Sequence, residues 1–328
     1  MSNNKKQIDS NQSTNNSSIH QSNIPNNTTD TPTSSSSSSI ADTAITQFAH
    51  QVAGHRNEII QKYQNNKIIK PCIKLHYFRR EVNFYENIFN NNDCISHSIL
   101  RQYLPKYHGL LTLENAATTT DTTHTTTNTT NAIPYTEPKQ YIILDDLTIG
   151  CINPCILDIK IGLKTYEPSS SQTKVNSQLN KFKYQAILGF RLSGMKVYNI
   201  ITNTYSYYDK SYGRAVTPES VNRSVATYFY NGHILRKDII IQIIQKLEVF
   251  KNYLSLQTLY HYYTCSLLLI YEGQTGDSGE TDFYAKGHNS VGAHLIDFAH
   301  VCDGNGVVDT NFVQGLEKFL TVLYELLL

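Results

Sequence analysis

The stretch that decides the fold of this chain is Pro154-Cys155-Ile156-Leu157-Asp158-Ile159-Lys160-Ile161-Gly162. It is an apolar run between a proline and a glycine, and it carries one carboxylate and one ammonium group two residues apart. In an extended strand, residues i and i+2 point the same way, so Asp158 and Lys160 share one face while the aliphatic residues around them point into a core. The stretch therefore predicts a buried strand that presents two opposite charges, either to a polar and anionic ligand or as a structural ion pair.

Two low-complexity tracts lie outside the predicted core. Residues 1–43 consist mostly of Ser, Asn, Thr and Gln with almost no large apolar side chain, and residues 115–132 are rich in Thr. Such tracts bury too little apolar surface to offset the entropy of ordering, so we expect a disordered tail and a disordered insertion. Either tract is a spacer or genomic low-complexity sequence rather than a binding segment. Roughly 265 residues are left, which is enough for one large domain or two lobes with a shared core.

The composition argues against several classes of protein. The net charge of +1 gives no general attraction to nucleic acid or to a membrane surface. No apolar run approaches the length of a membrane span, and the polar amino terminus lacks the apolar region of a signal peptide. The six cysteines form no zinc-binding pattern, since Cys151 and Cys155 have no second pair or histidine cluster. We expect reduced thiols, no nucleic-acid partner, no membrane span, and a location in the cytoplasm, the nucleus or both.

Hydrophobic patterning predicts a mixture of strands and helices. Before the signature strand, we expect strands at 67–70 and 141–144, a helix over 81–89, and a turn at 105–109 that leads into a strand ending near Leu113. After it, we expect a helical segment at 173–187, a hairpin at 190–205 with its turn at 202–203, a helix over 236–254, strands at 267–271 and 293–298 around a Gly-rich loop, and a helix over 313–328. Together these elements predict an α+β fold.

The pattern P-x-x-x-D-x-K-x-G of the signature strand resembles the signature of the inositol polyphosphate kinase family, closest to its multikinase branch. Further segments resemble the same family: His50-Gln51-Val52-Ala53-Gly54-His55, Leu104-Pro105-Lys106-Tyr107-His108-Gly109, Leu144-Asp145-Asp146-Leu147-Thr148, Gly189-Phe190-Arg191-Leu192-Ser193-Gly194-Met195, Tyr212-Gly213-Arg214, Ser266-Leu267-Leu268, Tyr271-Glu272 and Ile296-Asp297-Phe298-Ala299-His300. The resemblance implies a two-lobed, protein-kinase-like α+β fold with antiparallel sheets and a hinge at 145–148. We accordingly expect an amino-terminal lobe at 44–147, a carboxy-terminal lobe at 148–328, and a short helical inositol-phosphate-binding segment at 163–188.

The resemblance also implies a nucleotide site for ATP with Mg²⁺. Lys70, at the end of a strand, is expected to contact the ATP phosphates, and Glu81, at the start of the next helix, is expected to orient it. The Asp145 carbonyl and the Leu147 amide are expected to bind adenine at the hinge. Without the resemblance, Lys70 reads as a solvated lysine and 145–147 as a plain exposed turn.

Three residues carry the expected chemistry. Phosphoryl transfer needs mainly cations on the phosphates, carboxylates that hold magnesium, and a positioned acceptor hydroxyl. By resemblance, Asp158 lies close to the ribose and the reaction centre, Lys160 neutralises the charge that builds in the transition state, and Asp297 is the magnesium ligand. A lone buried carboxylate at 297 is costly unless it is paired or metal-bound, and the alternative is an aspartate that caps the following turn.

Substrate selection is expected in the segment after the signature strand. Lys174, Gln178 and Lys181 are spaced by four and three residues, which places them on one face of a helix. Taken alone they indicate a solvated helix face, whereas the resemblance implies that they bind an inositol phosphate through charge-assisted hydrogen bonds. His300 is a further candidate contact to a substrate phosphate, with an ordinary structural histidine as the alternative.

The segment between Gly162 and Gly189 is short, and family members restricted to inositol trisphosphate carry a larger helical insertion there. Ser177 and Tyr77 also depart from the family, which has longer polar or basic residues at these places. A short segment implies an open site, so the predicted function is a monomeric, ATP-dependent kinase of inositol tris- and tetrakisphosphates such as inositol 1,4,5-trisphosphate, with phosphoinositide lipids as further candidate substrates. The alternatives are an inositol hexakisphosphate kinase that makes pyrophosphates and a non-catalytic scaffold with a kinase fold. A protein kinase is disfavoured, because the chain lacks a G-x-G-x-x-G loop and a His-Arg-Asp motif.

Overall fold

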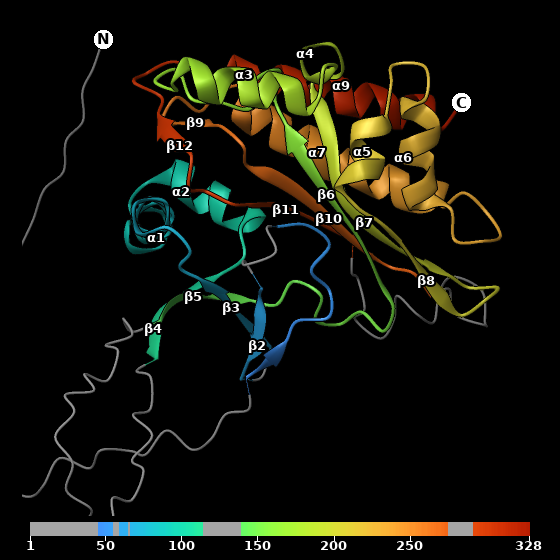
Figure 1. Cartoon of the computed structure of the whole chain (residues 1–328), viewed down its shortest axis with the longest axis horizontal. Helices are drawn as coiled ribbons and strands as arrows, with labels where there is room; N and C mark the ends of the chain where they lie inside the picture. Colours follow the sequence, from blue (N-terminus) through green and yellow to red (C-terminus); the bar gives the residue numbers. More distant parts are fainter. Residues whose placement is uncertain (1–44, 55–58, 65, 114–138, 275–290) are drawn as a thin grey trace, which may run out of the picture. The chain divides into compact units, whose positions relative to one another are not determined.

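The computed structural model describes residues 45–54, 59–64, 66–113, 139–274 and 291–328 (Figure 1). The tail predicted over 1–43, the insertion predicted over 115–132 and most of the predicted Gly-rich loop lie outside the described residues. The described chain forms two five-stranded antiparallel sheets accompanied by helices, which confirms the α+β prediction.

The amino-terminal lobe is built on the first of these sheets. Its strand order is β1-β2-β3-β5-β4, with bounds Thr46–Gln47 (β1), Gln61–Tyr63 (β2), Lys67–Pro71 (β3), Lys139–Asp145 (β5) and Tyr107–Leu113 (β4). Between β3 and β4 the chain forms α1 (Leu75–Asn90), α2 (Ile95–Leu100) and the 3₁₀ turn η1 (Arg101–Tyr103). The predicted strands at 67–70 and 141–144 are confirmed, since they lie in β3 and β5.

Two local predictions in this lobe are wrong. The helix α1 begins at Leu75, so Glu81 lies in its second turn and not at its start. The apolar spacing is hidden there because two arginines directly follow Phe78, the first side chain that the helix buries. The predicted turn at 105–109 already contains the start of β4, which bulges between Tyr107 and Leu110. Gly109 adopts a φ of +101° within this bulge, a conformation that costs glycine little, and so the strand pairing continues through it.

The carboxy-terminal lobe is built on the second sheet, in the order β11-β10-β6-β7-β8. The bounds are Gly292–Ile296 (β11), Ser266–Glu272 (β10), Pro154–Ile161 (β6), Phe190–Asn199 (β7) and Thr204–Tyr208 (β8), and a small pair joins β9 (Tyr260–Tyr262) to β12 (Val301–Asp303). The helices are α3 (Gln172–Lys181), α4 (Gln185–Leu188), α5 (Lys210–Ala215), α6 (Val221–Phe229), α7 (Lys237–Leu254) and α9 (Thr310–Glu325). The predicted hairpin, the predicted strands and the two long helices are confirmed. The helix predicted over 173–187 is instead two helices, because the buried Phe182 adopts an extended backbone between them.

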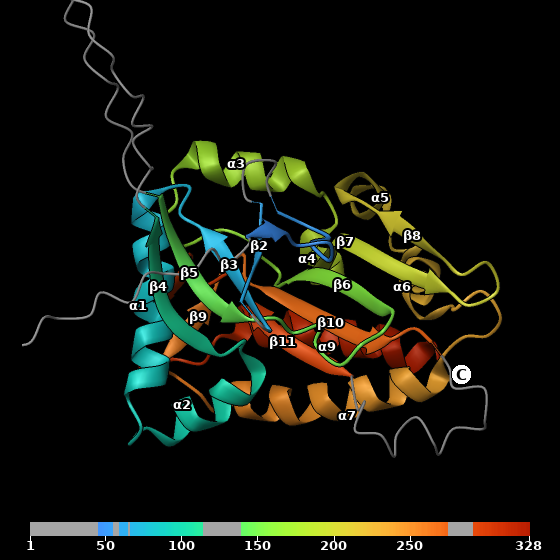
Figure 2. The same ribbon diagram turned by 90° about the horizontal axis from the view of Figure 1, so that it is seen from below.

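The signature strand β6 lies at the centre of this second sheet, between β10 and β7. Helices α6, α7 and α9 cover one face of the sheet, and its other face turns toward the amino-terminal lobe (Figures 1 and 2). Leu157, Ile159 and Ile161 have no solvent exposure and belong to the core. Asp158 and Lys160 lie on the opposite face, so the predicted division of the strand into an apolar and a charged side is confirmed.

The two lobes share one continuous core. Phe298, which follows β11, stacks on Phe84 of α1 with ring centroids 4.3 Å apart, and it meets the ring of Tyr85 edge-on at 5.3 Å. Phe298 and Tyr85 are almost fully buried. This aromatic contact fixes the residue before Phe298, Asp297, opposite the amino-terminal lobe.

The carboxyl end of β6 is held by a contact among three glycines. The Gly162 amide donates to the Gly189 carbonyl at 2.8 Å, and a Cβ atom on Gly315 of α9 would lie 2.5 Å from the Gly162 nitrogen and 2.5 Å from the Gly189 oxygen.

Since backbone atoms cannot easily move aside, we expect Gly315→Ala to lower the free energy of unfolding by about 1–3 kcal/mol, the usual cost of overpacking. Urea unfolding measures this. Gln314→Ala, on the exposed side of the same turn, is the control and should stay within about 0.5 kcal/mol of wild type; equal stability of the two variants contradicts the contact.

Candidate active site

A pocket opens between the two sheets and encloses about 920 Å³, including space open to solvent. Apolar side chains from both lobes line it, namely Phe48, Val52, Ile60, Ile68 and Leu144 from the first and Ile156, Leu268, Ile270 and Ile296 from the second. Charged side chains line it as well, namely Lys70, Glu81, Asp158 and Asp297. This combination suits a ligand that has one flat apolar part and one anionic part.

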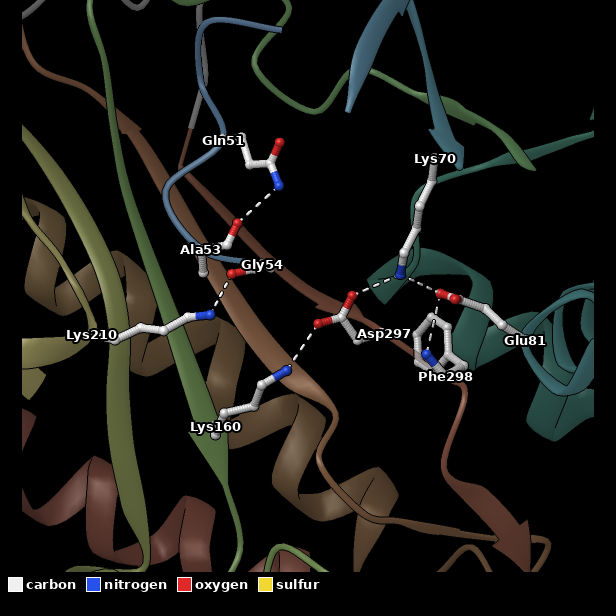
Figure 3. Close-up of polar contacts among 9 residues, drawn as sticks. All are labelled: Gln51, Ala53, Gly54, Lys70, Glu81, Lys160, Lys210, Asp297 and Phe298. Atoms are coloured by element: carbon white, nitrogen blue, oxygen red, sulfur yellow. Dashed lines mark hydrogen bonds and ion pairs between the residues drawn. The ribbon is translucent and has the colours of Figure 1, made fainter. Parts of the chain in front are cut away.

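A chain of alternating charges crosses the pocket (Figure 3). Lys70 Nζ of β3 lies 2.8 Å from Glu81 Oε1 of α1 and 2.8 Å from Asp297 Oδ1. The other oxygen of Asp297, Oδ2, lies 2.9 Å from Lys160 Nζ of β6. The structure therefore brings together four of the predicted site residues, which the sequence separates by as many as 227 positions. Lys160 pairs with Asp297 rather than with its strand neighbour Asp158.

Asp297 is held in an unusual backbone conformation. Its φ is +68°, in the left-handed region that Asp and Asn adopt more readily than most residues. Burial alone raises the pKa of its carboxyl, but the ammonium groups of Lys160 and then Lys70 outweigh burial and hold this pKa well below its usual range. Its side chain is still 38% exposed through the pocket, so the carboxylate is ionised, paired and accessible to a ligand.

Asp158 differs from Asp297 in its surroundings. It is 4% exposed, and burial raises the pKa of its carboxyl, which Lys160 partly counteracts. Within the described part of the chain, its Oδ1 atom has no hydrogen-bond partner. A buried oxygen without a partner is costly, so this atom is available to a ligand group or an ion in the pocket.

The end of β5 forms the connection between the lobes and one edge of the pocket. Asp145, Leu147 and Thr148 line it. The Asp146 carboxylate accepts hydrogen bonds from the Thr148 amide at 2.9 Å and from the Thr148 hydroxyl at 2.6 Å, which turns the chain after the strand. Asp145 Oδ1 contacts His108 Nε2 at 2.5 Å, so this side chain is engaged with β4. Adenine binding by the Asp145 carbonyl and the Leu147 amide stays a prediction.

A group of basic side chains gathers beside the pocket. Ser171 caps α3 by accepting from the Lys174 amide at 3.3 Å, and Lys174 and Gln178 are half-buried on the inner side of the helix. Gln178 Oε1 accepts from the Thr165 hydroxyl at 3.3 Å. Burial lowers the pKa of Lys181, and so do nearby positive charges on Arg191, Arg214, Lys210 and Lys174. Such a concentration of positive charge favours a polyanionic ligand.

His300 is tied to a carboxylate that the sequence analysis missed. Its Nδ1 atom is hydrogen-bonded to Glu167, which also accepts from Arg80 Nη1 at 3.0 and 3.2 Å. The His300 ring meets Tyr77 edge-on at 4.5 Å, and Lys174 Nζ lies 5.7 Å from the Tyr77 ring centroid. Burial lowers the pKa of His300, while the bond to Glu167 opposes this shift. Because the carboxylate can only accept, Nδ1 carries the proton and Nε2 is left for a ligand.

The site has the charge arrangement of a phosphotransferase, and comparison with known proteins identifies its family. The model of the inositol polyphosphate kinase family matches residues 141–324. The chain belongs to this family.

Relatives within the family include multikinases from animals and plants. The chain is 32% identical to human inositol polyphosphate multikinase over 234 residues, covering 69% of this chain and 51% of the relative. It is 27% identical to inositol polyphosphate multikinase beta of Arabidopsis thaliana over 311 residues, covering 85% and 92%. The chain thus spans about half the length of the mammalian multikinases it matches.

Two further comparisons bear on fold and branch. The solved structure of the inositol phosphate multikinase Ipk2 of S. cerevisiae, in complex with ADP and Mn²⁺, aligns with a TM-score of 0.59 at 25% identity, covering 80% of this chain and all of that one. Rat inositol hexakisphosphate kinase 2 is 29% identical over 219 residues, covering 57% of this chain and 52% of that protein. The two-lobed α+β fold implied by the resemblance is therefore confirmed.

Several charged residues of this site were not predicted from the sequence. Arg191 and Arg214 lie inside segments quoted for their resemblance, and Lys210 lies just before one of them, yet none was singled out. Glu167 is the first acidic residue after the signature strand. An isolated carboxylate so close to a buried strand indicates that a partner must come from elsewhere in the fold. Arg80 adjoins Glu81, but only the packing of α1 against β12 brings its side chain to Glu167.

Proposed function

We propose that the chain is an ATP-dependent inositol polyphosphate kinase of the multikinase type, which phosphorylates inositol tris- and tetrakisphosphates. The observation that carries this proposal is the Lys70–Asp297–Lys160 charge chain, in which ammonium groups from both lobes share one carboxylate of the pocket. On the other side, Lys160 lies opposite Arg191 of the basic group in the β6–β7 register. Phosphoryl transfer depends almost entirely on positioning and on electrostatic stabilisation. A polyanionic acceptor and a nucleotide phosphate meet at these two ammonium groups.

The nucleotide is assigned to the pocket between the sheets. The adenine lies between the apolar walls and binds the Asp145 carbonyl and the Leu147 amide. Among the described residues no protein group accepts from the Leu147 amide, which leaves it available. Lys70, oriented by Glu81, contacts the phosphates. The complex of the S. cerevisiae relative with ADP and Mn²⁺ supports ATP and a divalent cation as the cofactors.

The residues present fit a magnesium ion. Mg²⁺ is usually bound by one or two carboxylates together with substrate phosphates rather than by an all-protein cage. In the described residues no group of three or more His, Cys, Asp or Glu side chains could hold a metal alone. Asp297, ionised and accessible, would hold the ion, and the Asp158 oxygen without a hydrogen-bond partner among the described residues is a second candidate. When bound, Mg²⁺ neutralises charge on the phosphates.

The acceptor is assigned to the basic group. Lys174, Gln178 and Lys181 of α3 hold ring phosphates, and His300 Nε2 faces the same ligand. Lys160 lies between this group and the pocket, where it stabilises the charge of the phosphoryl group in transfer. Asp158, close by, lies on the nucleotide side of the site.

The panel of acceptors decides between branches of the family. Purified protein with magnesium and ATP is offered inositol tris-, tetrakis-, pentakis- and hexakisphosphates, and the products are resolved by chromatography. We expect turnover of the tris- and tetrakisphosphates. Turnover of the hexakisphosphate alone favours a hexakisphosphate kinase, an alternative that the similarity to the rat enzyme supports. No turnover of any acceptor favours the non-catalytic scaffold.

The oligomeric state, the location and further partners of the chain complete the proposal. We propose a monomer in the cytoplasm, the nucleus or both, without a nucleic-acid partner. Within the described residues no helix is long and apolar enough to cross a membrane. Phosphoinositide headgroups share the phosphate chemistry of the acceptor, so vesicles that contain them belong in the acceptor panel.

Glu167 gives a test of the acceptor side. Glu167→Gln keeps the size of the side chain but removes the charge that His300 and Arg80 share. We expect the KM for inositol trisphosphate to rise about tenfold, the effect of losing one hydrogen bond to a charged group, with the KM for ATP nearly unchanged. Steady-state kinetics measure both constants. Glu317→Gln, an exposed glutamate of α9, is the control, and equal kinetics of the two variants contradict the role of Glu167.

A further inference from the structure

A short segment of the amino-terminal lobe, Gln51–Gly54, lines the pocket and is here called the roof segment. It is anchored within its own lobe by Gln51, whose Oε1 accepts from the Ile60 amide at 2.9 Å and whose Nε2 donates to the Ala53 carbonyl at 2.9 Å. The segment also contacts the carboxy-terminal lobe. The Gly54 carbonyl accepts from Lys210 Nζ of α5 (Figure 3).

The middle of the roof segment lies directly on β7. A Cβ atom on Gly194 would be 1.9 Å from the Val52 carbonyl oxygen, so only glycine allows this approach. Lys196 lies two residues further along β7 than Gly194 and therefore on the same face of the strand. Its partner in the neighbouring strand β6 is Ile156, a residue that lines the pocket. The roof segment therefore rests on the pocket-facing side of the second sheet.

Lys196 is an unusual lysine. It is only 3% exposed, and in the described residues no carboxylate lies within ion-pair distance of it. Its ammonium group lies 4.0 Å from the ring centroid of Tyr205 and 5.7 Å from that of Tyr207, so aromatic faces take the place of an anion. Its nitrogen also lies 2.9 Å from Nδ1 of His50, the residue just before the roof segment.

The His50–Lys196 pair has a defined protonation. Burial and then the charge of Lys196 lower the pKa of His50, and Asp146 opposes this shift. Burial likewise lowers the pKa of Lys196. A neutral His50 accepts through Nδ1 while the lysine donates, and the ring of His50 packs edge-on against Phe48 at 5.5 Å. One partly buried hydrogen bond thus connects the pocket lining of one lobe to the sheet of the other.

We infer that Lys196 is a positioning residue for the nucleotide, which acts through His50 to hold the roof segment over the pocket. The inference rests on the proposed function, because it takes ATP or ADP as the ligand below the roof. A lysine whose only task is stability is poorly explained here, since a buried cation without an anion costs free energy that an apolar side chain of the same length avoids. The burial of Lys196 is explained if it serves the geometry of the pocket.

The test is Lys196→Met, which keeps the length of the side chain and removes the donor. We expect the dissociation constant of magnesium-ADP, measured by calorimetry, to rise about tenfold, the KM for inositol trisphosphate to stay within about twofold of wild type, and Tm to be unchanged or higher. His50→Phe keeps the ring packing and removes the acceptor, so it should have a similar effect on ADP. The double variant should be no worse than either single one, because the two residues act through one bond.

Hydrogen exchange over residues 48–54, measured without nucleotide, reports on the roof segment itself and should be faster in Lys196→Met. Lys237→Met, which alters a lysine that donates to the Leu327 carbonyl at the surface, is the control and should match wild type in every measurement. If wild-type protein fails to bind ADP, the proposed function fails, and exchange still tests the contact. Unchanged exchange, unchanged ADP affinity, or a lowered Tm with equal effects on both substrates overturns the inference.

Discussion

Lys160→Met is expected to lower kcat by about 10²–10³-fold, the usual effect of removing one preorganised electrostatic group from an active site. Lys160 Nζ lies 2.9 Å from Asp297 Oδ2, and burial is offset by Asp297 and Asp158, which raise its pKa above the ordinary value. The side chain is therefore a permanent cation at the point where the nucleotide pocket meets the acceptor group. Lys70, the other ammonium group that pairs with Asp297, is also engaged by Glu81.

Kinetic constants separate this role from a structural one. An interaction made mainly in the transition state lowers kcat and kcat/KM together, whereas the KM for ATP changes little. Folding should be nearly unaffected, since methionine fills the same volume and Asp297 keeps its contact with Lys70. The Lys237→Met variant serves again as the control. A kcat within tenfold of wild type, at an unchanged Tm, excludes Lys160 from the chemistry.

Much of the fold could be predicted because its patterns are local. The two-residue period of the signature strand predicts that Asp158 and Lys160 face away from Leu157 and Ile159, and this holds because a strand buried on one side fixes its own register. The hairpin of β7 and β8 and the amphipathic helix α7 could be predicted for the same reason, since the pattern of each lies within one short segment. The start of α1 was not predicted, since charged residues at 79–81 interrupt the apolar pattern of its first turns and only tertiary packing selects the helix.

The candidate site could be predicted residue by residue but not as a network. Lys70, Lys160 and Asp297 were each expected in the site, yet the sharing of Asp297 between two lysines depends on contacts across 227 and 137 positions. No periodicity in a single sequence reports such a contact. Glu167 and Lys196 were missed for the same reason, because their partners in the other lobe, Arg80 and His50, reach them only when the lobes pack together.

Asp297→Asn is expected to have the largest effect, a fall in kcat of about 10³-fold or more, at the upper end of what one electrostatic group contributes. The substitution removes the charge that pairs with two ammonium groups and the carboxylate that fits Mg²⁺. Asparagine is the right replacement because Asp297 has a φ of +68°, and Asn tolerates this left-handed conformation about as well as Asp. An alanine variant would instead combine the loss of charge with backbone strain.

Stability in acid provides an independent readout of the same variant. Since the pKa of Asp297 lies well below its usual range, its carboxylate stabilises the fold above about pH 4, and this contribution is lost as the pH falls further. Asp297→Asn lacks the contribution at every pH, so its stability should depend less on pH in this acidic range. The exposed side chain of Asp303, on the nearby strand β12, provides the control variant Asp303→Asn. If Asp297→Asn keeps more than a tenth of wild-type kcat, phosphoryl transfer does not depend on this carboxylate and the charge chain serves only to join the lobes.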